Sequence, residues 1–362
     1  MTGDALPASA TRLSFVQELP STRVVFGRGS AADLLPEVER LGLERIVVIA
    51  DAGAAEVASN LIAPLGGRVA ASFDGVRPHV PAEMATRARE LAADARADGL
   101  LAIGGGSTTG TAKAVALTSR LPVLAVPTTY AGSEMTPVWG ITSGSTKRTG
   151  RSLDVLPRTV VYDPGLLDGL PARLAATSSL NAMAHCVEAL SAPASSPLIR
   201  IVALEGVKAL REGLDKMAAG ATRRPDELLY GAHVAGTAFG VAGSGLHHKI
   251  CHVLGGRFDL AHAELHAAIL PAVIEFNAPA LPARMADLAA SLAAADAGVG
   301  LRALYDRLRL NPTLESAGLH PADFEAAVDA VAGVLPLDNV RAVSRADVRA
   351  ILESAFAGRR RT

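Results

Sequence analysis

Short, continuously apolar runs recur in the first half of the chain and alternate with segments whose apolar residues have helical spacing. Such runs are typical of strands buried on both faces of a parallel sheet. The predicted helices include Pro81–Asp98 and Thr108–Ser119. This alternation predicts an α/β layer domain at residues 21–164, after a frayed N-terminus at residues 1–20. The runs predicted as strands are Val24–Phe26, Ile46–Ile49, Val69–Phe73, Leu100–Ile103, Val123–Val126 and Thr159–Tyr162.

From about residue 165 the strand signal fades, and amphipathic segments rich in alanine and leucine follow one another, separated by prolines and glycines. We therefore expect an all-helical domain at residues 165–362. No low-complexity linker separates the two halves, so we expect them to pack closely with a cleft between them. The segments predicted as helices are Pro171–Ser191, Ser196–Ala218, Pro225–His252 and His262–Asn277, followed by several more up to Ala357.

Composition excludes several classes of partner. The chain has 362 residues, 49% of them hydrophobic, and a net charge of −1. A chain so close to neutrality has no overall field that attracts nucleic acid or anionic lipid, so we expect neither as a partner. Two cysteines, Cys186 and Cys251, are too few for a disulfide framework and favour a reducing, cytoplasmic location. We expect no signal peptide and no membrane-spanning helix.

The histidines are concentrated in one stretch. Five of the nine lie between His247 and His266. His248 and His252 are four residues apart, which places them on one face of a helix. His262 follows the Gly255–Gly256 pair, which we expect to break the helix and to let His262 turn back toward the same point.

A second helix repeats this spacing with Asn181 and His185. Together with His248 and His262, these residues have the layout of a four-ligand metal site, but one ligand position carries an uncharged amide. Such a site suggests an oxidoreductase scaffold adapted to chemistry that does not use the metal.

Three features of the first half predict a dinucleotide site. Gly104–Ser107 follows a predicted strand and opens a helix, where free N–H groups and the helix dipole favour a pyrophosphate. The residues Thr128, Thr129 and Ser133 follow the next strand, at the sheet edge where open α/β sheets bind ligands. Asp51 ends another strand, and its carboxylate either accepts the adenosine ribose hydroxyls, which favours NADH over NADPH, or caps a helix.

These motifs resemble those of the iron-containing (group III) alcohol dehydrogenases, in the right order from about residue 20 to residue 355. Within that superfamily the details look like the maleylacetate reductase subgroup. The matching motifs are Gly104-Gly-Gly-Ser-Thr-Thr-Gly-Thr-Ala-Lys113, Tyr130-Ala-Gly-Ser-Glu-Met-Thr136, Asn181-Ala-Met-Ala-His-Cys-Val-Glu-Ala-Leu190 and His247-His-Lys-Ile-Cys-His252.

The resemblance implies a Rossmann-like nucleotide-binding domain, an all-α C-terminal domain of the dehydroquinate synthase-like fold, and a homodimer. The metal ligands of typical members fall on Asn181, His185, His248 and His262. Asp is expected at the first of these positions and also at Gly110, and both departures are shared with maleylacetate reductases. The cofactor-binding positions carried over are Gly104, Gly105, Gly106, Ser107, Thr128, Thr129 and Lys147, the last of which reaches the ribose; His252 matches a pocket histidine near the nicotinamide.

Reduction of an activated C=C bond fits a site without its metal-binding carboxylate. Hydride addition to maleylacetate places charge on the ketone oxygen as an enolate, which hydrogen bonds and a nearby acid stabilise. We expect His252 and His248 to polarise or protonate this dicarboxylate, and Lys249 to pair with a carboxylate. His185 and His262 are expected to line the pocket, with Tyr130 as an alternative proton donor. His79, beside Pro78, is expected to face solvent.

Other functions remain open at this point. A metal-dependent (iron or zinc) NAD(P)-linked alcohol or aldehyde dehydrogenase that tolerates Asn181 is the main alternative. A lyase related to dehydroquinate synthase needs a tightly bound metal and several phosphate-binding basic residues, neither of which is evident. A binding protein without catalysis has little reason to keep both a nucleotide turn and four convergent histidines.

Overall fold

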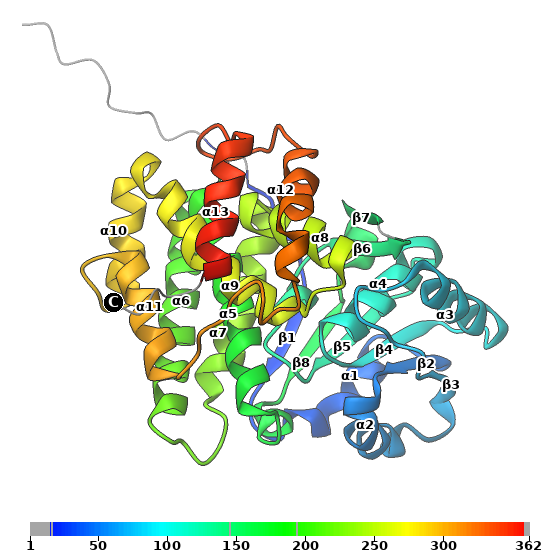
Figure 1. The fold of residues 1–362 in the computed structure, drawn as a ribbon. Helices are drawn as coiled ribbons and strands as arrows, with labels where there is room; N and C mark the ends of the chain where they lie inside the picture. The colour runs from blue at the N-terminus through cyan, green and yellow to red at the C-terminus, as the bar shows by residue number, and fades with distance from the viewer. Residues whose placement is uncertain (1–14, 16, 145, 193–194, 358–362) are drawn as a thin grey trace, which may run out of the picture.

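A six-stranded parallel sheet forms the core of the N-terminal half in this structure, a computed structural model that describes residues 15, 17–144, 146–192 and 195–357. The strand order is β1-β8-β5-β4-β2-β3 (Figure 1). Every strand predicted from the apolar runs is present, at almost the predicted bounds. They are β1 (Arg23–Phe26), β2 (Ile46–Ala50), β3 (Val69–Phe73), β4 (Gly99–Gly104), β5 (Val123–Pro127) and β8 (Thr159–Tyr162).

Both faces of this sheet are covered, which explains why its strands are apolar throughout. In β4, Leu101 and Ile103 pack on one face with Leu34, whereas Leu100 and Ala102 pack on the other with residues that include Ala88 and Val115. The covering helices are α1 (Leu34–Arg40), α2 (Ala55–Ile62), α3 (Ala82–Asp94) and α4 (Gly106–Ser119).

A two-stranded antiparallel hairpin, β6 (Val138–Ser143) with β7 (Thr146–Arg151), was not predicted. The second strand, Thr-Lys-Arg-Thr-Gly-Arg, has no apolar residue, so it lacks the alternation that marks a half-buried strand. Its Lys147 is nevertheless partly buried, on the side of the hairpin that contacts the helical half.

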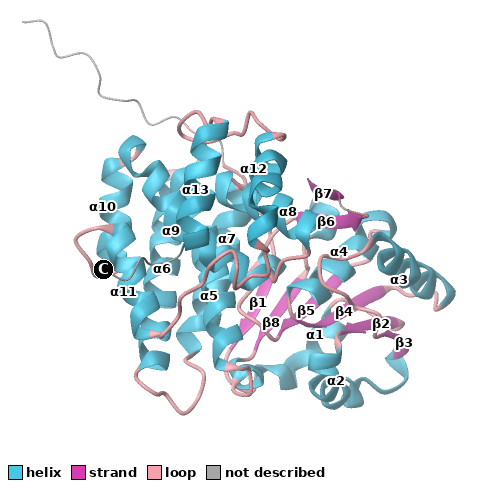
Figure 2. Cartoon of the chain, in the orientation of Figure 1, coloured by secondary structure: helices cyan, strands magenta, loops and turns pink. Residues whose placement is uncertain are grey.

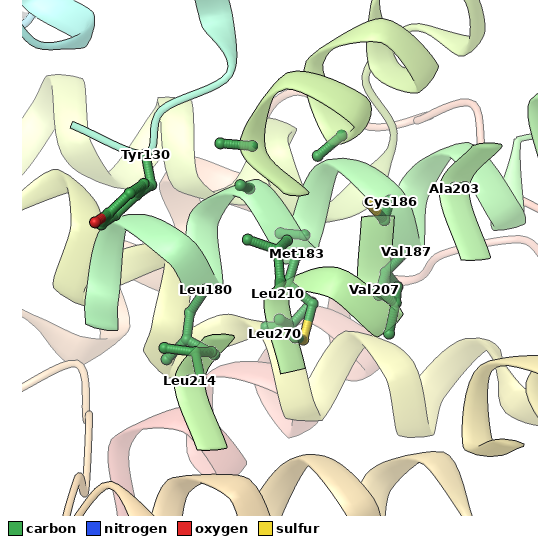
Figure 3. Close-up of a cluster of buried hydrophobic side chains, with 14 of the residues drawn as sticks. Tyr130, Leu180, Met183, Cys186, Val187, Ala203, Val207, Leu210, Leu214 and Leu270 are labelled. Atoms are coloured by element: carbon green, nitrogen blue, oxygen red, sulfur yellow. The ribbon is translucent and has the colours of Figure 1, made fainter. Parts of the chain in front are cut away.

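The C-terminal half is helical, and Figure 2 shows it beside the strands of the N-terminal half. Helices α5, α6 and α7 form its centre. Figure 3 shows Leu180 and Met183 of α5 meeting Leu210 and Leu214 of α6 in the largest buried cluster. No described helix is both long and apolar enough to cross a membrane. The helices are α5 (Ala172–Ser191), α6 (Pro197–Ala218), α7 (Asp226–Ala242), α8 (Leu246–Phe258), α9 (His262–Asn277), α10 (Pro282–Ser291), α11 (Ala297–Arg307), α12 (Phe324–Ala332) and α13 (Arg345–Ala357).

Two predicted helix boundaries are wrong. The segment Pro225–His252 is two helices, because Gly243 has φ of 81° and ends α7 before α8 begins. The Gly255–Gly256 pair does not interrupt the helix. Instead α8 continues through it to Phe258, and Asp259 ends the helix with φ of 50°. Short 3₁₀ helices connect many elements: η1 (Ser30–Asp33), η2 (Ala52–Ala54), η3 (Ala63–Arg68), η4 (Ser133–Met135), η5 (Leu153–Val155), η6 (Pro164–Leu167), η7 (Ala278–Ala280) and η8 (Pro321–Asp323).

Candidate active site

The glycine turn between β4 and α4 is shaped by its neighbours. Gly104 has φ of 154°, and a Cβ atom there would collide with Thr108 Oγ1 and with Asp51 Oδ2. A Cβ on Gly105 would lie 3.1 Å from Thr129 Cγ2. The helix α4 then begins at Gly106, so its free N–H groups lie at the carboxyl edge of the sheet, where an anion binds well.

Asp51 supports this turn from the end of β2. Its Oδ1 accepts a hydrogen bond from the Ala54 N–H (3.1 Å), and its Oδ2 accepts the Thr108 hydroxyl (2.6 Å) and the Gly105 N–H (3.4 Å). The helix-cap interpretation of Asp51 therefore holds for η2. Contact between Asp51 and a ribose stays a prediction. It would use the carboxylate lone pairs that these three hydrogen bonds leave free.

The segment after β5 forms the neighbouring wall. The Thr128 N–H donates to the Gly104 carbonyl oxygen (3.0 Å), which places Thr128 and Thr129 beside the glycine turn, both partly exposed. Ser133, which begins η4, has a buried hydroxyl without a hydrogen-bond partner among the described residues. Lys113 of α4 fixes this segment, since its Nζ donates to the carbonyl oxygens of Ser133 (2.6 Å) and Thr136 (2.6 Å).

A buried carboxylate orients the central histidine. Glu188 of α5 accepts the Nδ1 proton of His248 (2.5 Å) and the His248 backbone N–H (3.0 Å). Burial by itself raises the pKa of Glu188, but the proximity and hydrogen bonds of His248 more than offset this, so the pKa is lowered and the group is ionised. Because Nδ1 is engaged, the Nε2 atom of His248 is the nitrogen available to a ligand.

Aromatic stacking fixes the rest of the cluster. The rings of His185, Phe239 and His248 all contact one another, with ring centres 4.3 Å apart for His185 and Phe239, 4.8 Å for His185 and His248, and 4.7 Å for Phe239 and His248. The His248 ring also meets that of His252, at 5.8 Å. Asn181 is 6% exposed, and its Oδ1 has no partner among the described residues. The prediction that residues of α5 and α8 lie close together is therefore confirmed for His185 and His248.

The His262 ring meets that of His79, which lines a pocket between the two halves of the chain, the cleft, and His252 lies beside His248. His252 is partly exposed and His262 is exposed, yet burial among surrounding protein, together with the nearby charge of Lys147, lowers both pKa values well below 6.5. Contact with water combined with a dense protein surrounding is what the wall of a cleft provides. Both imidazoles are therefore neutral near pH 7, and each can donate one N–H hydrogen bond.

On the opposite side of α8, His247 and Cys251 face the interior. His247 Nε2 lies 3.0 Å from His266 Nδ1 and 3.8 Å from Cys251 Sγ, and both histidines are fully buried. Burial lowers the pKa of His247 to about 3. These residues are a packed layer behind the cleft.

Comparison with known proteins decides the family. The sequence profile described as "Iron-containing alcohol dehydrogenase" matches residues 21–164, and that described as "Fe-containing alcohol dehydrogenase family, C-terminal" matches residues 175–356. The chain belongs to the iron-containing alcohol dehydrogenase family. It is therefore an oxidoreductase, with the Rossmann-like and helical parts that this family combines.

Individual members of the iron-containing alcohol dehydrogenase family show which of its enzymes the chain resembles. The chain is 43% identical over 354 residues to "Maleylacetate reductase 2" of Cupriavidus pinatubonensis, covering 95% of this chain and 97% of that one. It is 42% identical to a maleylacetate reductase of Burkholderia cepacia, covering 95% and 98%. The crystal structure of maleylacetate reductase from Rhizobium sp. strain MTP-10005 superposes with a TM-score of 0.88 at 40% identity, covering 95% of this chain and 99% of that chain.

The residues at the family's metal position do not fit a metal well. Among the described residues, one set of three histidine, cysteine or acidic side chains brings its donor atoms within 4.8 Å of one another, namely His247, Cys251 and His266. His185, His248 and His262 are not such a set. The fourth position carries Asn181, whose amide oxygen adds no charge to attract a cation. The donor set is thus both spread apart and without an acidic ligand.

Two predicted residues, Lys249 and Tyr130, lie at the margin of the site or outside it. Lys249 is exposed on α8, and its charge contributes to lowering the pKa of His252, after burial and other nearby charges. Tyr130 is 1% exposed and lies in the buried cluster beside Leu180 (Figure 3). Burial raises the pKa of Tyr130, and the charges that affect this pKa are those of Arg224, Asp168, Arg28 and Asp226, with no histidine among them.

Sequence reasoning missed two residues. Glu188 lies three residues after His185 and seven after Asn181, so all three share one face of α5, and this spacing was a usable signal. The expectation that His79 faces solvent is wrong, because only 11% of its side chain is exposed and its ring meets that of His262. His79 lies in a turn, so no helical or strand periodicity in the sequence indicated the direction of its side chain.

Proposed function

We propose that the protein reduces the C=C bond of maleylacetate to give 3-oxoadipate, with NADH as the preferred reductant and without a metal ion. This reaction belongs to the degradation of aromatic compounds. The observation that carries the proposal is Asn181, an uncharged amide in place of the metal-binding carboxylate, in a chain similar to maleylacetate reductases over nearly its whole length.

The cofactor is proposed to lie across the carboxyl edge of the sheet. Its pyrophosphate would meet the Gly104–Ser107 turn and the start of α4. Thr128, Thr129 and Ser133 would form the adjacent wall. Asp51 would repel a 2′-phosphate, so NADH is preferred and NADPH is the alternative. Lys147 would reach the ribose.

Bound NAD(P)H supplies a hydride to the alkene carbon β to the ketone. The electron pair of the C=C bond then moves toward the ketone, giving an enolate, and a proton added to the α-carbon completes the saturated product. His252 and His248 are proposed to donate hydrogen bonds to the ketone oxygen and to deliver the proton. His185 and His262 line the pocket. Glu188 holds His248 with its Nε2 atom free to act.

The charge of the substrate suits this pocket. Neutral imidazoles become easier to protonate when an anion lies beside them, because the nearby negative charge favours the cationic form. A dicarboxylate therefore supplies the condition under which a histidine becomes a proton donor. Lys249 at the edge of the site remains the predicted partner of one carboxylate, whereas the burial of Tyr130 in the apolar cluster disfavours it as the alternative proton donor.

The deciding experiment measures NADH oxidation at 340 nm on addition of freshly prepared maleylacetate, before and after dialysis against EDTA, with metal analysis of the same samples. We expect rapid oxidation that survives chelation by a protein with far less than one metal ion per chain. Activity that disappears with EDTA and returns with iron or zinc, accompanied by oxidation of simple alcohols, would instead establish a metal-dependent alcohol dehydrogenase.

We further propose two domains, at residues 21–164 and 165–362, and a homodimer formed through the first. Strand β1 is at an edge of the sheet. Phe26 on this strand is 40% exposed and meets the ring of Tyr230, which is 38% exposed. An open edge beside exposed aromatic rings is typical of a surface that pairs with another chain. Light scattering after gel filtration should give twice the chain mass of 37.1 kDa, and Phe26→Lys should shift it toward the monomer.

The cysteines support a cytoplasmic location for this enzyme. Cys186 and Cys251 are both free and buried. Burial raises the pKa of each thiol, so neither is a reactive thiolate. Free thiols of this kind persist in a reducing compartment.

A further inference from the structure

A strained turn places His79 at the edge of the histidine site. His79 and Val80 have φ of 61° and 54°, a left-handed conformation that is rare outside glycine and unfavourable for a β-branched residue. The His79 ring meets that of His262 edge-on, with ring centres 6.0 Å apart and an interplanar angle of 79°. Backbone strain of this kind persists where the surrounding structure enforces it, and it is concentrated at ligand sites.

The β6 strand holds the turn in this shape. Thr142 Oγ1 donates to the His79 carbonyl oxygen (2.7 Å), and the Thr142 N–H donates to the Val80 carbonyl oxygen (3.0 Å). The Val80 side chain is 6% exposed and packs in a small cluster with Ala85 and Ala114. The side chains of the two turn residues therefore point in different directions. Val80 points into the protein, and His79 points toward the cleft.

Gly110 of α4 makes room for this arrangement. A Cβ atom on Gly110 would lie 2.8 Å from Val80 Cγ2, closer than two carbon atoms can approach. Typical metal-dependent members of the family are expected to have an aspartate at this position, which Val80 would not permit here. The glycine therefore has a structural role, since it allows the turn that directs His79.

A pocket of about 570 Å³ opens beside His79, between the two halves of the chain. Its walls come from this turn, from the β6–β7 hairpin (Thr142–Gly144) and from the end of α8 (Gly255, Gly256). Asp259 Oδ1, 3.8 Å from His79 Nε2, belongs to a side chain that is 95% exposed, so solvent weakens this contact.

Lys147 supplies positive charge at the same place. Lys147 is paired with Thr142 across the β6–β7 hairpin, and Thr142 holds the turn that carries His79. The charge of Lys147 also lowers the pKa of His79, after burial, and that of His262. No hydrogen bond or ion pair joins Lys147 Nζ to any residue in the part of the chain that the structure describes. Three N–H donors on one ammonium allow it to contact a cofactor ribose and an anion together.

We propose that His79 and Lys147 bind the carboxylate on the acetate arm of the substrate, an assignment that rests on the proposed reductase function. In maleylacetate one methylene separates the ketone from this carboxylate. The His79 ring lies 6.0 Å from that of His262, a pocket-lining residue, so His79 adjoins the histidines that are proposed to hold the ketone. His79 is then a determinant of specificity for dicarboxylates.

The test compares maleylacetate with 4-oxopent-2-enoate, which keeps the reacting enone and its adjoining carboxylate but lacks the acetate-arm carboxylate. For His79→Ala we expect KM for maleylacetate to rise about 10- to 100-fold, the effect of losing a hydrogen bond to a charged group, with a smaller change in kcat. His79→Gln, which keeps an N–H donor, should recover part of this loss. For 4-oxopent-2-enoate, kcat/KM of wild type and variants should agree within about twofold.

Two controls separate the possible outcomes. NADH affinity, measured by fluorescence quenching, should be unchanged in both variants, and the exposed His320→Gln should behave as wild type throughout. Wild-type reduction of maleylacetate tests the proposed function itself, so its failure is distinct from failure of the His79 assignment. An unchanged KM for maleylacetate in His79→Ala, or equal losses for the two substrates, would overturn the assignment.

Gly110→Ala tests whether the turn positions His79. This variant cannot contact the substrate, yet it should raise KM for maleylacetate and leave 4-oxopent-2-enoate unaffected. Val80→Ala in the same chain removes the methyl group that the new Cβ meets and should restore part of the affinity. Gly169→Ala is the matched control, because a Cβ there meets no atom within 4 Å. Equal KM values for Gly110→Ala and Gly169→Ala, with both proteins folded, would contradict the positioning role.

Discussion

Replacing Glu188 with alanine is expected to lower kcat for maleylacetate reduction by about 100-fold, the scale of a lost general acid–base contribution. Glu188 accepts two hydrogen bonds from His248, one from the ring at 2.5 Å and one from the backbone at 3.0 Å. Without this carboxylate the His248 ring can turn, so its Nε2 atom is no longer held toward the substrate. The measurement is steady-state kinetics, with kcat and KM determined separately for maleylacetate and NADH.

The Glu188→Gln variant distinguishes orientation from charge. An amide oxygen still accepts one of the His248 hydrogen bonds, so we expect a loss of about 10-fold, intermediate between wild type and alanine. Both variants should lower the free energy of unfolding, by about 2 kcal/mol for alanine, because buried His248 donors lose their partner. Glu205→Ala, on the exposed face of α6, is the control. A kcat for Glu188→Ala within threefold of wild type would show that His248 needs no such orientation.

The sheet was predicted well from the sequence because strands that are buried on both faces consist of continuous apolar runs. Strands such as β2 and β4 are buried almost throughout, so their apolar runs have no competing explanation. The β6–β7 hairpin has no such apolar run, since its residues are half-buried or exposed. The pattern of apolar and polar residues in a segment indicates which of its faces are exposed to solvent. It does not indicate which distant segment of the chain packs against it.

The candidate site was predictable where residues share one helix face. Asn181 with His185, and His248 with His252, were found by their four-residue spacing. Glu188 lies on the same face of α5, three residues after His185 and seven after Asn181, and was missed although this spacing was a usable signal. His79 could not have been found, since its position depends on Thr142 of β6 and on the space over Gly110, both remote in sequence.

Asn181→Asp is expected to have the largest effect on metal binding. Asparagine and aspartate have nearly the same shape, so the substitution adds one negative charge at the position where typical family members have a metal ligand. A carboxylate beside three histidines should bind zinc on the order of 100-fold more tightly than the amide does. Equilibrium dialysis with zinc, comparing variant and wild type, measures this difference. His247, Cys251 and His266 are the same in both proteins, so any zinc held there cancels.

The same substitution should lower metal-free reduction of maleylacetate by at least about 10-fold. Asn181 is 6% exposed, so the new charge would lie in a region of low dielectric, where it opposes both a dianionic substrate and a developing enolate. Asn181→Ala removes the amide without adding charge, and we expect it to lose less activity and to gain no zinc affinity. If wild type binds zinc as tightly as Asn181→Asp does and loses its reductase activity when the zinc is removed, the amide is itself a working ligand and the metal-independent mechanism fails. If zinc affinity rises while reduction falls, one uncharged side chain accounts for the difference between a metal-dependent dehydrogenase and a reductase of dicarboxylic enones.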